Sequence, residues 1–485
     1  MKKRDNGYLT VYLALCVTLL LSLCLTLIEG ARRNGARLEA EIAAEVSMQS
    51  VLAEYHRELF YQYNIFAVDS SYGTALPVKA NTERRLEYYL EKNLDVREVF
   101  LGFLFYRDFF ALSPENISVT KVSVLTDGGG AVFRNCAADA IKDDVGLNLL
   151  DELQDWIQVI EVNGLEERDV EAEMDSLDGE IREYDGREFD IGEEEPYVLH
   201  VSNPASHLEE QRRKGILKLV LEENSDLSAN VIRTEGLILN RMERGTVNQG
   251  NIAIKELSEG EQLLERFFFQ EYLLRYMGHY ARECDEDALR YQVEYLVAGG
   301  ESDVDNLRTV LKRICAIREA ANTLYLYSDQ EKRGMAELAA ALVCDLAMVP
   351  ELTPVLEAAI LLGWAYAESI YDIKVLLAGG KVPLIKDEAT WHYSLSGALS
   401  GKPEGQEDTK EGLSYEDYLR IFMMCTDRNI LTARAMNMVE ADIRLTPGNG
   451  AFRLDGCYAG LEACMEIESG YGFDFQATRK KFYID

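Results

Sequence analysis

The sequence is poor in the residues that build zinc sites, disulfide frameworks and nucleic-acid interfaces. It has 5 histidines and 9 cysteines, and no two cysteines form a C-x-x-C pair. Neither a zinc site nor a disulfide framework is therefore indicated. Lysine and arginine number 50 against 84 aspartates and glutamates, which gives a net charge of −34. Because nucleic acids and anionic lipid surfaces bind basic faces, this balance argues against both as partners.

Proline is also scarce, and motifs that would select a reaction are missing. The 9 prolines in 485 residues suit a helix-rich fold, since proline breaks helices. The glycine run at 128–130 lacks the Lys-Ser/Thr of a phosphate-binding loop, and the sequence has neither G-x-S-x-G nor H-E-x-x-H. We therefore predict no catalytic residue, no metal site and no cofactor, and expect that the protein is not an enzyme.

What the sequence does have is a long uncharged segment near its N-terminus. Residues 6–28 carry no charge, and the segment from Tyr8 to Ile28 is apolar. As a helix with a rise of 1.5 Å per residue, residues 8–28 extend roughly 31 Å, the thickness of the hydrocarbon core of a membrane. A secretory signal has a shorter apolar region and a small-x-small cleavage site. We predict a cytoplasmic tail over 1–7 and a transmembrane helix over 8–28.

The side of the membrane on which the body lies is a separate expectation. Basic residues flank both ends of the apolar segment, at 2–4 and at 32, 33 and 37, so the positive-inside rule does not decide the orientation. A short tail is more easily retained in the cytoplasm while a long acidic body is translocated. We therefore expect a single-pass protein of the cell membrane with the bulk of the chain extracytoplasmic.

Helical periodicity continues beyond the apolar segment, over residues 29–63, which we name the stalk helix. One apolar face recurs at spacings of 4, 3 and 4, in Met48, Leu52, Tyr55 and Leu59. We expect this face to be buried and the helix to be continuous with the membrane span. Glu54 and Glu58 fall on the opposite face, which predicts that they are exposed.

Three charged residues lie where the membrane span meets the stalk helix. Glu29 stands three and four residues before Arg32 and Arg33, the favourable order for ion pairs within a helix. We interpret Glu29 as an interfacial residue paired with one of these arginines. The alternative is that Glu29, Arg32 and Arg33 contact a partner helix.

The N-terminal segment resembles a known type of protein. Basic residues, then Gly7, then an apolar run closed by Ile-Glu-Gly-Ala-Arg-Arg at 28–33 resemble the start of TadE/TadG-like proteins of the tight-adherence (Flp) pilus system. The continuation MQSVLAEYHRELFYQYNIFAVDSSYG, Met48–Gly73, is similar to an uncharacterised Gram-positive family of membrane-anchored proteins with a large body of unknown function. The resemblance implies a structural or assembly component of a tight-adherence-type pilus or secretion system, with other such components as partners.

The sequence departs from the pilin pattern at one position. In type IV pilins a peptidase cuts after a glycine, and a glutamate stands five residues later. After Gly7 that position is held by Tyr12. We therefore expect an uncleaved anchor.

The rest of the chain predicts a small sheet and a large helical part, an α+β fold in which helix dominates. Periodicity of two predicts strands at 64–69, 117–125 and 197–201, and a C-terminal pair at 451–468 and 473–483. Helical periodicity predicts helices at 81–94, 131–160, 261–282, 303–327, 330–348, 352–377, 415–425 and 430–444. The apolar run 358–367 is too short to cross a membrane, so we expect a buried helix there. The expected ranges are an α+β region at 64–201, a helical region at 202–447 and C-terminal strands at 448–485.

Residues 165–195 form a strongly acidic segment with three interspersed glycines. We expect a solvated loop, because such a segment has little apolar surface to bury. Calcium binding is the alternative, although no stretch has the register of a calcium loop.

Histidines and paired carboxylates supply the remaining candidates for chemistry. His279, Glu283 and Cys284 in GHYAREC form a metal-like group, but ligands on one helix need another from elsewhere. We interpret His279 as a partly exposed residue paired with a carboxylate. His56 is expected on the polar face of the stalk helix, and His200 and His207 flank a turn that could form a loop site.

Glu368 and Asp372 stand one helical turn apart on the predicted helix 352–377. They could form a carboxylate pair for acid–base chemistry, but we favour a solvated helix edge. Two functions therefore stay open. One is a non-enzymatic assembly protein of the cell envelope. The other is a membrane-tethered enzyme or ligand-binding receptor that uses a cleft in the helical region.

Overall fold

The computed structural model describes residues 6–74, 76–95, 108–186, 188–189, 197–198, 206–221, 227–243, 250–253, 257–282, 287–400 and 411–483. The chain forms two compact units that interleave in sequence. The first comprises 1–140, 236–258 and 443–485, and the second comprises 141–235 and 259–442. Residues 141–201, expected in the α+β region, therefore belong to the second unit, together with most of the helical region. The predicted α+β fold with helix dominant is confirmed.

The first unit is built on an antiparallel sheet with β5 (Cys457–Ser469) at its centre. One edge of β5 pairs with β2 (Leu112–Val124), and the other with β6 (Phe473–Phe482) and the short β1 (Val68–Asp69). These are the strands expected in the early part of the chain and at the C-terminus. The expected strand at 197–201 is wrong for this sheet, because β4 (Tyr197–Val198) pairs with β3 (Glu188–Phe189) in the second unit.

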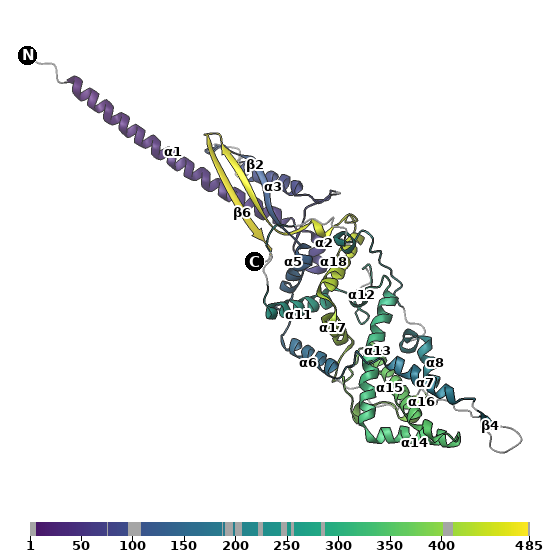
Figure 1. Cartoon of the computed structure of the whole chain (residues 1–485). Helices are drawn as coiled ribbons and strands as arrows, with labels where there is room; N and C mark the ends of the chain where they lie inside the picture. Colours follow the sequence, from purple (N-terminus) through teal and green to yellow (C-terminus); the bar gives the residue numbers. More distant parts are fainter. Residues whose placement is uncertain are drawn as a thin grey trace, which may run out of the picture. The chain divides into compact units, whose positions relative to one another are not determined.

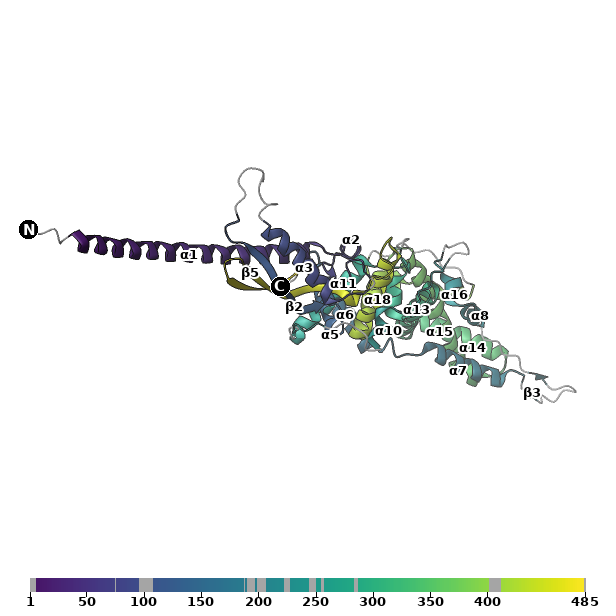
Figure 2. The ribbon, with the colours of Figure 1, turned by 90° about the horizontal axis from the view of Figure 1, so that it is seen from above.

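Two helices cover one face of this sheet. α1 (Asn6–Ala53) runs beside the β5–β6 hairpin with its second half, and α3 (Lys79–Leu94) lies next to that half (Figures 1 and 2). Along β5, buried apolar side chains alternate from Leu461 to Glu468 with less buried ones, which are three glutamates and Cys464. The buried residues form one core with Met48 and Leu52 of α1. The residues that a period of two places on one face of the strand therefore pack in this core against those that a period of 3.6 places on one face of the helix.

The stalk helix is shorter than expected. α1 ends at Ala53, and a separate helix, α2 (Arg57–Tyr63), follows. His56 has an extended backbone, and its imidazole Nδ1 accepts a hydrogen bond from the Leu59 amide at 3.2 Å. This N-cap starts a new helix and ends the first one. His56 therefore lies at a helix junction and is half-buried, and burial lowers its pKa.

The apolar face expected on the stalk helix is largely confirmed. Met48, Leu52 and Leu59 are buried, and Tyr55 is half-buried against the Phe66 ring at 5.0 Å. Glu54, expected on an exposed face, is instead held by α3.

The Glu54 carboxylate accepts hydrogen bonds from Arg85 Nε at 2.7 Å and from the Tyr89 hydroxyl at 2.5 Å. Burial acts to raise the pKa of Glu54, but these two donors outweigh it and lower the pKa. The expectation was wrong because the break at residues 54–56 and the position of α3 are not visible in local periodicity.

Two further helices belong to the first unit, and one follows a predicted glycine turn. α5 spans Asp127–Asp139, and α10 spans Ile238–Glu243. Gly128, Gly129 and Gly130 all have positive φ, between 61° and 84°. A side chain is strained in this region, so the run of three glycines makes the turn between β2 and α5 possible.

The second unit is helical around the packed pair α13 (Asp303–Ser328) and α15 (Thr353–Leu377) (Figure 1). The buried helix expected at 358–367 is confirmed as part of α15. The other helices of this unit are α6 (Asn148–Val162), α7 (Val170–Tyr184), α8 (Ser206–Lys214), α9 (Ile216–Val220), α11 (Glu259–Tyr276), α12 (Gln292–Ala298), α14 (Gln330–Leu346), α16 (Leu395–Ser400), α17 (Tyr415–Cys425) and most of α18 (Arg428–Leu445).

The acidic segment expected as a solvated loop is wrong over α7. Val170, Met174 and Leu177 pack against Leu362 of α15, and Ile181 is also buried. These residues recur at spacings of 4, 3 and 4, so one apolar stripe is enough to hold a helix whose other faces are charged. Residues 190–195 of the segment lie outside the described residues.

Three substitutions test the packing of α1. We expect Leu52→Asp to destabilise the protein by at least about 3 kcal/mol, because it removes buried apolar surface and leaves a charge in the core. Glu54→Ala should cost about 0.5–1.5 kcal/mol, since it removes the hydrogen bonds from Arg85 and Tyr89 and water replaces them only in part. Glu58→Ala is the control and should stay within about 0.5 kcal/mol. Thermal unfolding of the full-length protein measures all three, and a parent-like melting of Leu52→Asp contradicts the described core.

Candidate functional site

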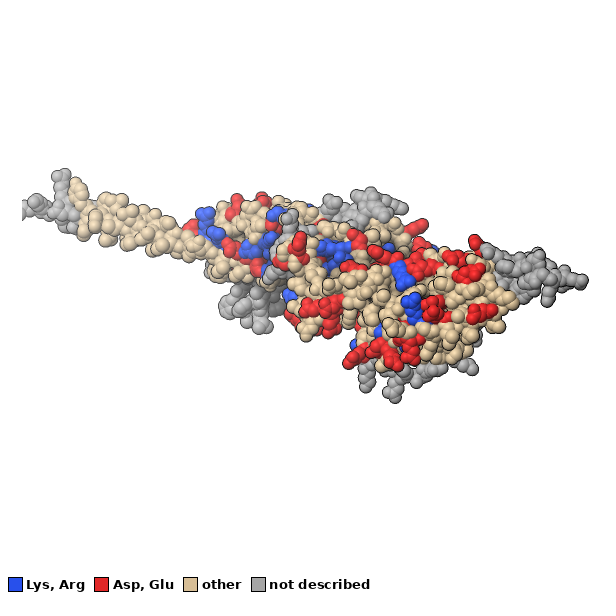
Figure 3. Space-filling view, turned by 60° about the horizontal axis from the view of Figure 1, so that its bottom comes forward, with Lys and Arg blue, Asp and Glu red and all other residues tan. Residues whose placement is uncertain are grey.

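The first half of α1 is long and apolar enough to cross a membrane by length and composition. From Tyr8 to Ile28 every side chain is exposed except Cys16, which is half-buried. Figure 3 shows this stretch without a single charged side chain, and the first red and blue side chains follow at its end. An exposed, uniformly apolar surface of this size is unfavourable in water. The finding supports the expected transmembrane helix.

The three charged residues at the end of this stretch bind within the first unit. Arg32 Nη1 lies 3.7 Å from a Glu29 carboxylate oxygen, as the helical spacing predicted. The Arg32 guanidinium also stacks over the Tyr471 ring at 4.0 Å, and that of Arg33 over Phe473 at 5.7 Å. These cation–π contacts tie α1 to the turn between β5 and β6. Contact of these residues with a partner helix stays a prediction.

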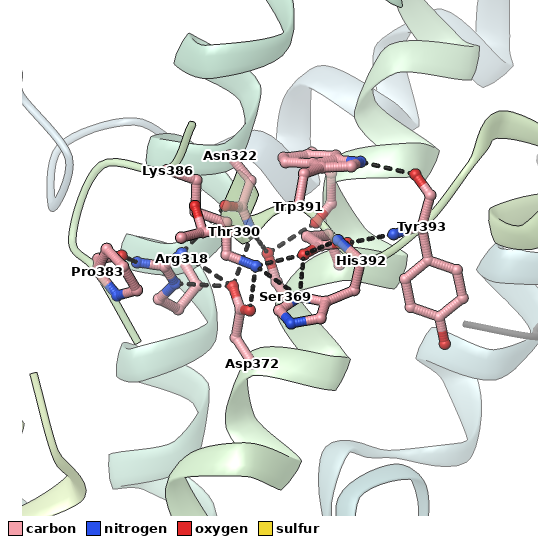
Figure 4. A network of polar contacts seen from close by, with 12 residues as sticks. Arg318, Asn322, Ser369, Asp372, Pro383, Lys386, Thr390, Trp391, His392 and Tyr393 are labelled. Carbon is pink, nitrogen blue, oxygen red and sulfur yellow. Dashed lines mark hydrogen bonds and ion pairs between the residues drawn. The ribbon is translucent and has the colours of Figure 1, made fainter. Parts of the chain in front are cut away.

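The expected carboxylate pair lies at the centre of the second unit. Glu368 and Asp372 on α15 are both completely buried, so the interpretation as a solvated helix edge was wrong. Between them stands the ammonium group of Lys386, which is ion-paired with Glu368 and lies 2.5 Å from Asp372 Oδ1 (Figure 4). The lysine follows α15 in a non-helical segment, and its side chain is also fully buried.

A second cation completes this network. Arg318 of α13 donates from Nε to Asp372 Oδ2 at 2.9 Å. Its Nη1 donates to the backbone carbonyls of Pro383 and Leu384, at 2.7 and 2.9 Å. The Asn322 amide donates to Asp372 Oδ2 at 3.1 Å. Arg318 thus binds both α15 and the segment that carries Lys386 (Figure 4).

The network is electrically balanced, with two carboxylates against one ammonium and one guanidinium. Burial acts to raise the pKa of Asp372, but the charges of Arg318 and Lys386 outweigh it and lower the pKa. Burial likewise acts to lower the pKa of Arg318, and the Asp372 charge outweighs it and raises the pKa. Both groups therefore stay ionised. Removing charged groups from water costs several kcal/mol per ion, so buried charges must be paired. All four charges of this network are paired.

Glu368 also fixes the segment that follows Lys386. Its carboxylate accepts hydrogen bonds from the backbone amides of His392 and Tyr393, at 3.1 and 3.0 Å, and lies 2.9 Å from His392 Nδ1. The indole N–H groups of Trp364 and Trp391 both donate to the Tyr393 carbonyl, at 2.9 and 2.7 Å. Residues 391–393 are therefore held rigidly although they belong to no helix or strand.

Glu368, Asp372 and His392 bring ligand-type atoms within 4.8 Å of one another. Carboxylates and an imidazole can bind a divalent cation. Here the ammonium group of Lys386 lies between the carboxylates and supplies the positive charge that such an ion would bring. The residues therefore do not fit a metal centre, and they fit a structural ion-pair network.

The expected group around His279 is not assembled among the described residues. His279 is fully buried, so the interpretation as a partly exposed residue was wrong. Its Nε2 lies 3.4 Å from a carboxylate oxygen of Glu416, which comes from α17. Glu283, Cys284 and His200 lie outside the described residues, as does the His207 side chain.

A second buried ion pair lines a cavity of about 580 Å³ in the second unit. Arg212 of α8 is ion-paired with Glu319 of α13 and stacks over the Tyr366 ring at 4.4 Å. Burial raises the pKa of Glu319 to about 7, despite the charge of Arg212. Sequence analysis missed Arg212, Glu319, Lys386 and His392 because nothing in their local patterns shows that they are buried.

Replacement of Lys386 tests the network. We expect Lys386→Met to destabilise the protein by about 3–5 kcal/mol, because Glu368 and Asp372 lose the cation between them. Lys374→Met is the matched control, since Lys374 is exposed on α15, the helix that carries Glu368 and Asp372, and it should cost less than about 0.5 kcal/mol. Urea unfolding followed by tryptophan fluorescence compares the two variants. Equal unfolding midpoints contradict the described network.

Comparison with known proteins adds one relationship. No curated protein and no solved structure matches the chain. A family model described as a family of unknown function (DUF5702) matches residues 194–469. The matched range contains the network of Figure 4 and strand β5, and it begins after the segment that resembles TadE/TadG-like proteins. The chain therefore belongs to the family of unknown function DUF5702.

Proposed function

We propose that this protein is a single-pass membrane protein whose body lies outside the cytoplasm. In this proposal it serves, without enzymatic activity, as a structural or assembly component of a tight-adherence-type pilus or secretion system. The observation that supports the proposal is α1 itself. Its first half is exposed and apolar, and its second half packs into the core of an antiparallel sheet. A single helix thus links a membrane span to a folded unit, as the resemblance to pilin-like proteins implies.

A second feature of α1 favours an assembly role. Beyond the membrane span, Leu38, Ile42 and Val46 are 60%, 49% and 39% exposed and recur every four residues. They lie on the side of the helix that the sheet does not cover. Exposed apolar side chains in a row on one helix are typical of a surface that binds another helix. A partner component of the same apparatus would cover this row.

The extracytoplasmic position is tested by labelling an engineered cysteine. Glu115 is exposed on β2, so Glu115→Cys should react with a membrane-impermeant maleimide in intact cells stripped of their wall. The background is Cys425→Ser, because Cys425 is the exposed cysteine outside the apolar segment among the described residues. Lys3→Cys is the control and should react only after lysis. Labelling of Glu115→Cys only after lysis contradicts the proposed orientation.

The assembly role is tested by a photo-crosslinking amino acid placed at Ile42. We expect irradiation of intact cells to yield a covalent product with another membrane or envelope protein, which mass spectrometry identifies. The same amino acid at Glu87, an exposed position of α3, is the control and should yield no such product. If Ile42 and Glu87 give the same result, the row on α1 binds no partner and the assembly role is wrong.

A further inference from the structure

His56 stands between α1 and α2, and a chain of hydrogen bonds fixes the role of each of its ring nitrogens. The Thr446 hydroxyl donates to the Ile443 carbonyl at 2.6 Å, so its oxygen accepts from the Asn449 side-chain amide at 2.7 Å. The Asn449 carboxamide oxygen therefore faces His56 Nε2, at 3.3 Å. Because this oxygen can only accept, Nε2 carries the proton of a neutral imidazole.

The other ring nitrogen, Nδ1, then carries no hydrogen and can accept. It accepts the hydrogen bond from the Leu59 amide at 3.2 Å that caps α2. The imidazole also packs against the Phe452 ring, with 4.6 Å between the ring centroids. The backbone amide of His56 donates to the Ala67 carbonyl at 2.9 Å. The fold thus holds His56 in one neutral tautomer.

A second proton on this imidazole can go only to Nδ1, since Nε2 already carries one. That proton removes the acceptor of the cap and sets two donors, Nδ1–H and the Leu59 amide, against each other. The contact with Asn449 is kept, because Nε2 donates in both forms. Protonation of His56 therefore acts on one bond, the one that begins α2.

The surroundings of the ring oppose this protonation. His56 lines a cavity of about 280 Å³, and the titratable groups around it are Glu54 and Tyr55 before it, Arg57 and Glu58 on α2, and Asp69 and Tyr72 on and after β1. Burial lowers the pKa of His56, and the charges of Asp69 and Glu58 only partly offset this effect. When the junction opens, the ring returns to the ordinary histidine pKa of about 6.5. The open form then binds a proton that the closed form does not bind, so the closed junction is stable above this pH and loses stability below it.

Beyond the cap, α2 and the residues after it connect α1 to the end of the sheet. The Phe60 and Phe66 rings pack at 4.4 Å between centroids, and Phe66 stacks on Tyr483, the residue after β6, at 5.6 Å. The Tyr483 hydroxyl donates to the Leu52 carbonyl of α1. We propose that His56 makes this connection an acid-sensitive joint, which opens when Nδ1 takes up a proton. The inference does not depend on the assembly role proposed above.

Hydrogen exchange of the full-length protein in lipid nanodiscs, read by mass spectrometry, tests the joint. From about pH 7.5 to about pH 5, on either side of the ordinary histidine pKa, the protection of α2 should fall by roughly fivefold or more after correction for the intrinsic exchange rate. The helix α3 lies in the same unit and should keep its protection, because Glu54, whose pKa is lowered, stays ionised and bound to Arg85. The proposal is overturned if α2 keeps its protection at the lower pH, or if α3 loses as much as α2.

Matched variants connect this response to His56. His56→Asn keeps a side-chain acceptor at the N-cap, where asparagine is among the preferred residues, but brings no group that titrates in this range. It should abolish the acid response of α2, and His56→Ser, with a shorter acceptor, should do the same. His207→Asn makes the same change on α8 of the second unit and should leave the response as it is in the parent. A parent-like acid response in His56→Asn and His56→Ser overturns the proposal.

Discussion

The apolar contact between the second half of α1 and the sheet is the constraint on which the first unit depends. Met48 and Leu52 of α1 share one core with Leu461 and Met465 of β5. The same helix carries the exposed apolar segment that is long enough to cross a membrane. Arg32 and Arg33 extend the contact to the β5–β6 turn through the rings of Tyr471 and Phe473.

The second unit has four charged side chains in its helical core. Lys386 and Arg318 neutralise Glu368 and Asp372, and Arg318 also binds the backbone of the segment that carries Lys386. A core of apolar side chains would often be as stable as such a network. The charges add directional contacts, because hydrogen bonds to carboxylates fix the position and orientation of backbone amides. Apolar contacts are not directional. The result is a rigid non-helical segment at 391–393 that lines a cavity.

The two units differ in the features that they carry. The first carries the apolar segment that is long enough to cross a membrane and an uncovered row of apolar residues on α1. The second carries the ion-pair networks and the two cavities beside them, and most of the range matched by the family model falls in it. Membership of DUF5702 therefore rests mainly on the second unit and on strand β5.

Local pattern determined much of this protein from the sequence alone. The uncharged run at 8–28, the helix over α15 and the alternation along β2 and the C-terminal hairpin depend only on residues near one another in the chain. They were predicted because helix and strand periodicity, and the length of an apolar run, are local properties. The helical order of Glu29 and Arg32 was predicted on the same basis.

Only the tertiary structure decided the environment of the charged residues. In the sequence, Glu368 and Asp372 are typical of a solvated helix edge. In the fold, Lys386 and Arg318 lie against them, and Arg318 is separated from Asp372 by 54 residues. The sequence predicts that Glu54 is exposed, but Arg85 of α3 binds it. It predicts a loop over α7, but the apolar side chains of this helix pack against Leu362. The pairing of β5 with β2 likewise joins segments that are far apart in sequence. The burial of a side chain depends on which distant segment packs against it. Periodicity along one segment does not contain that information.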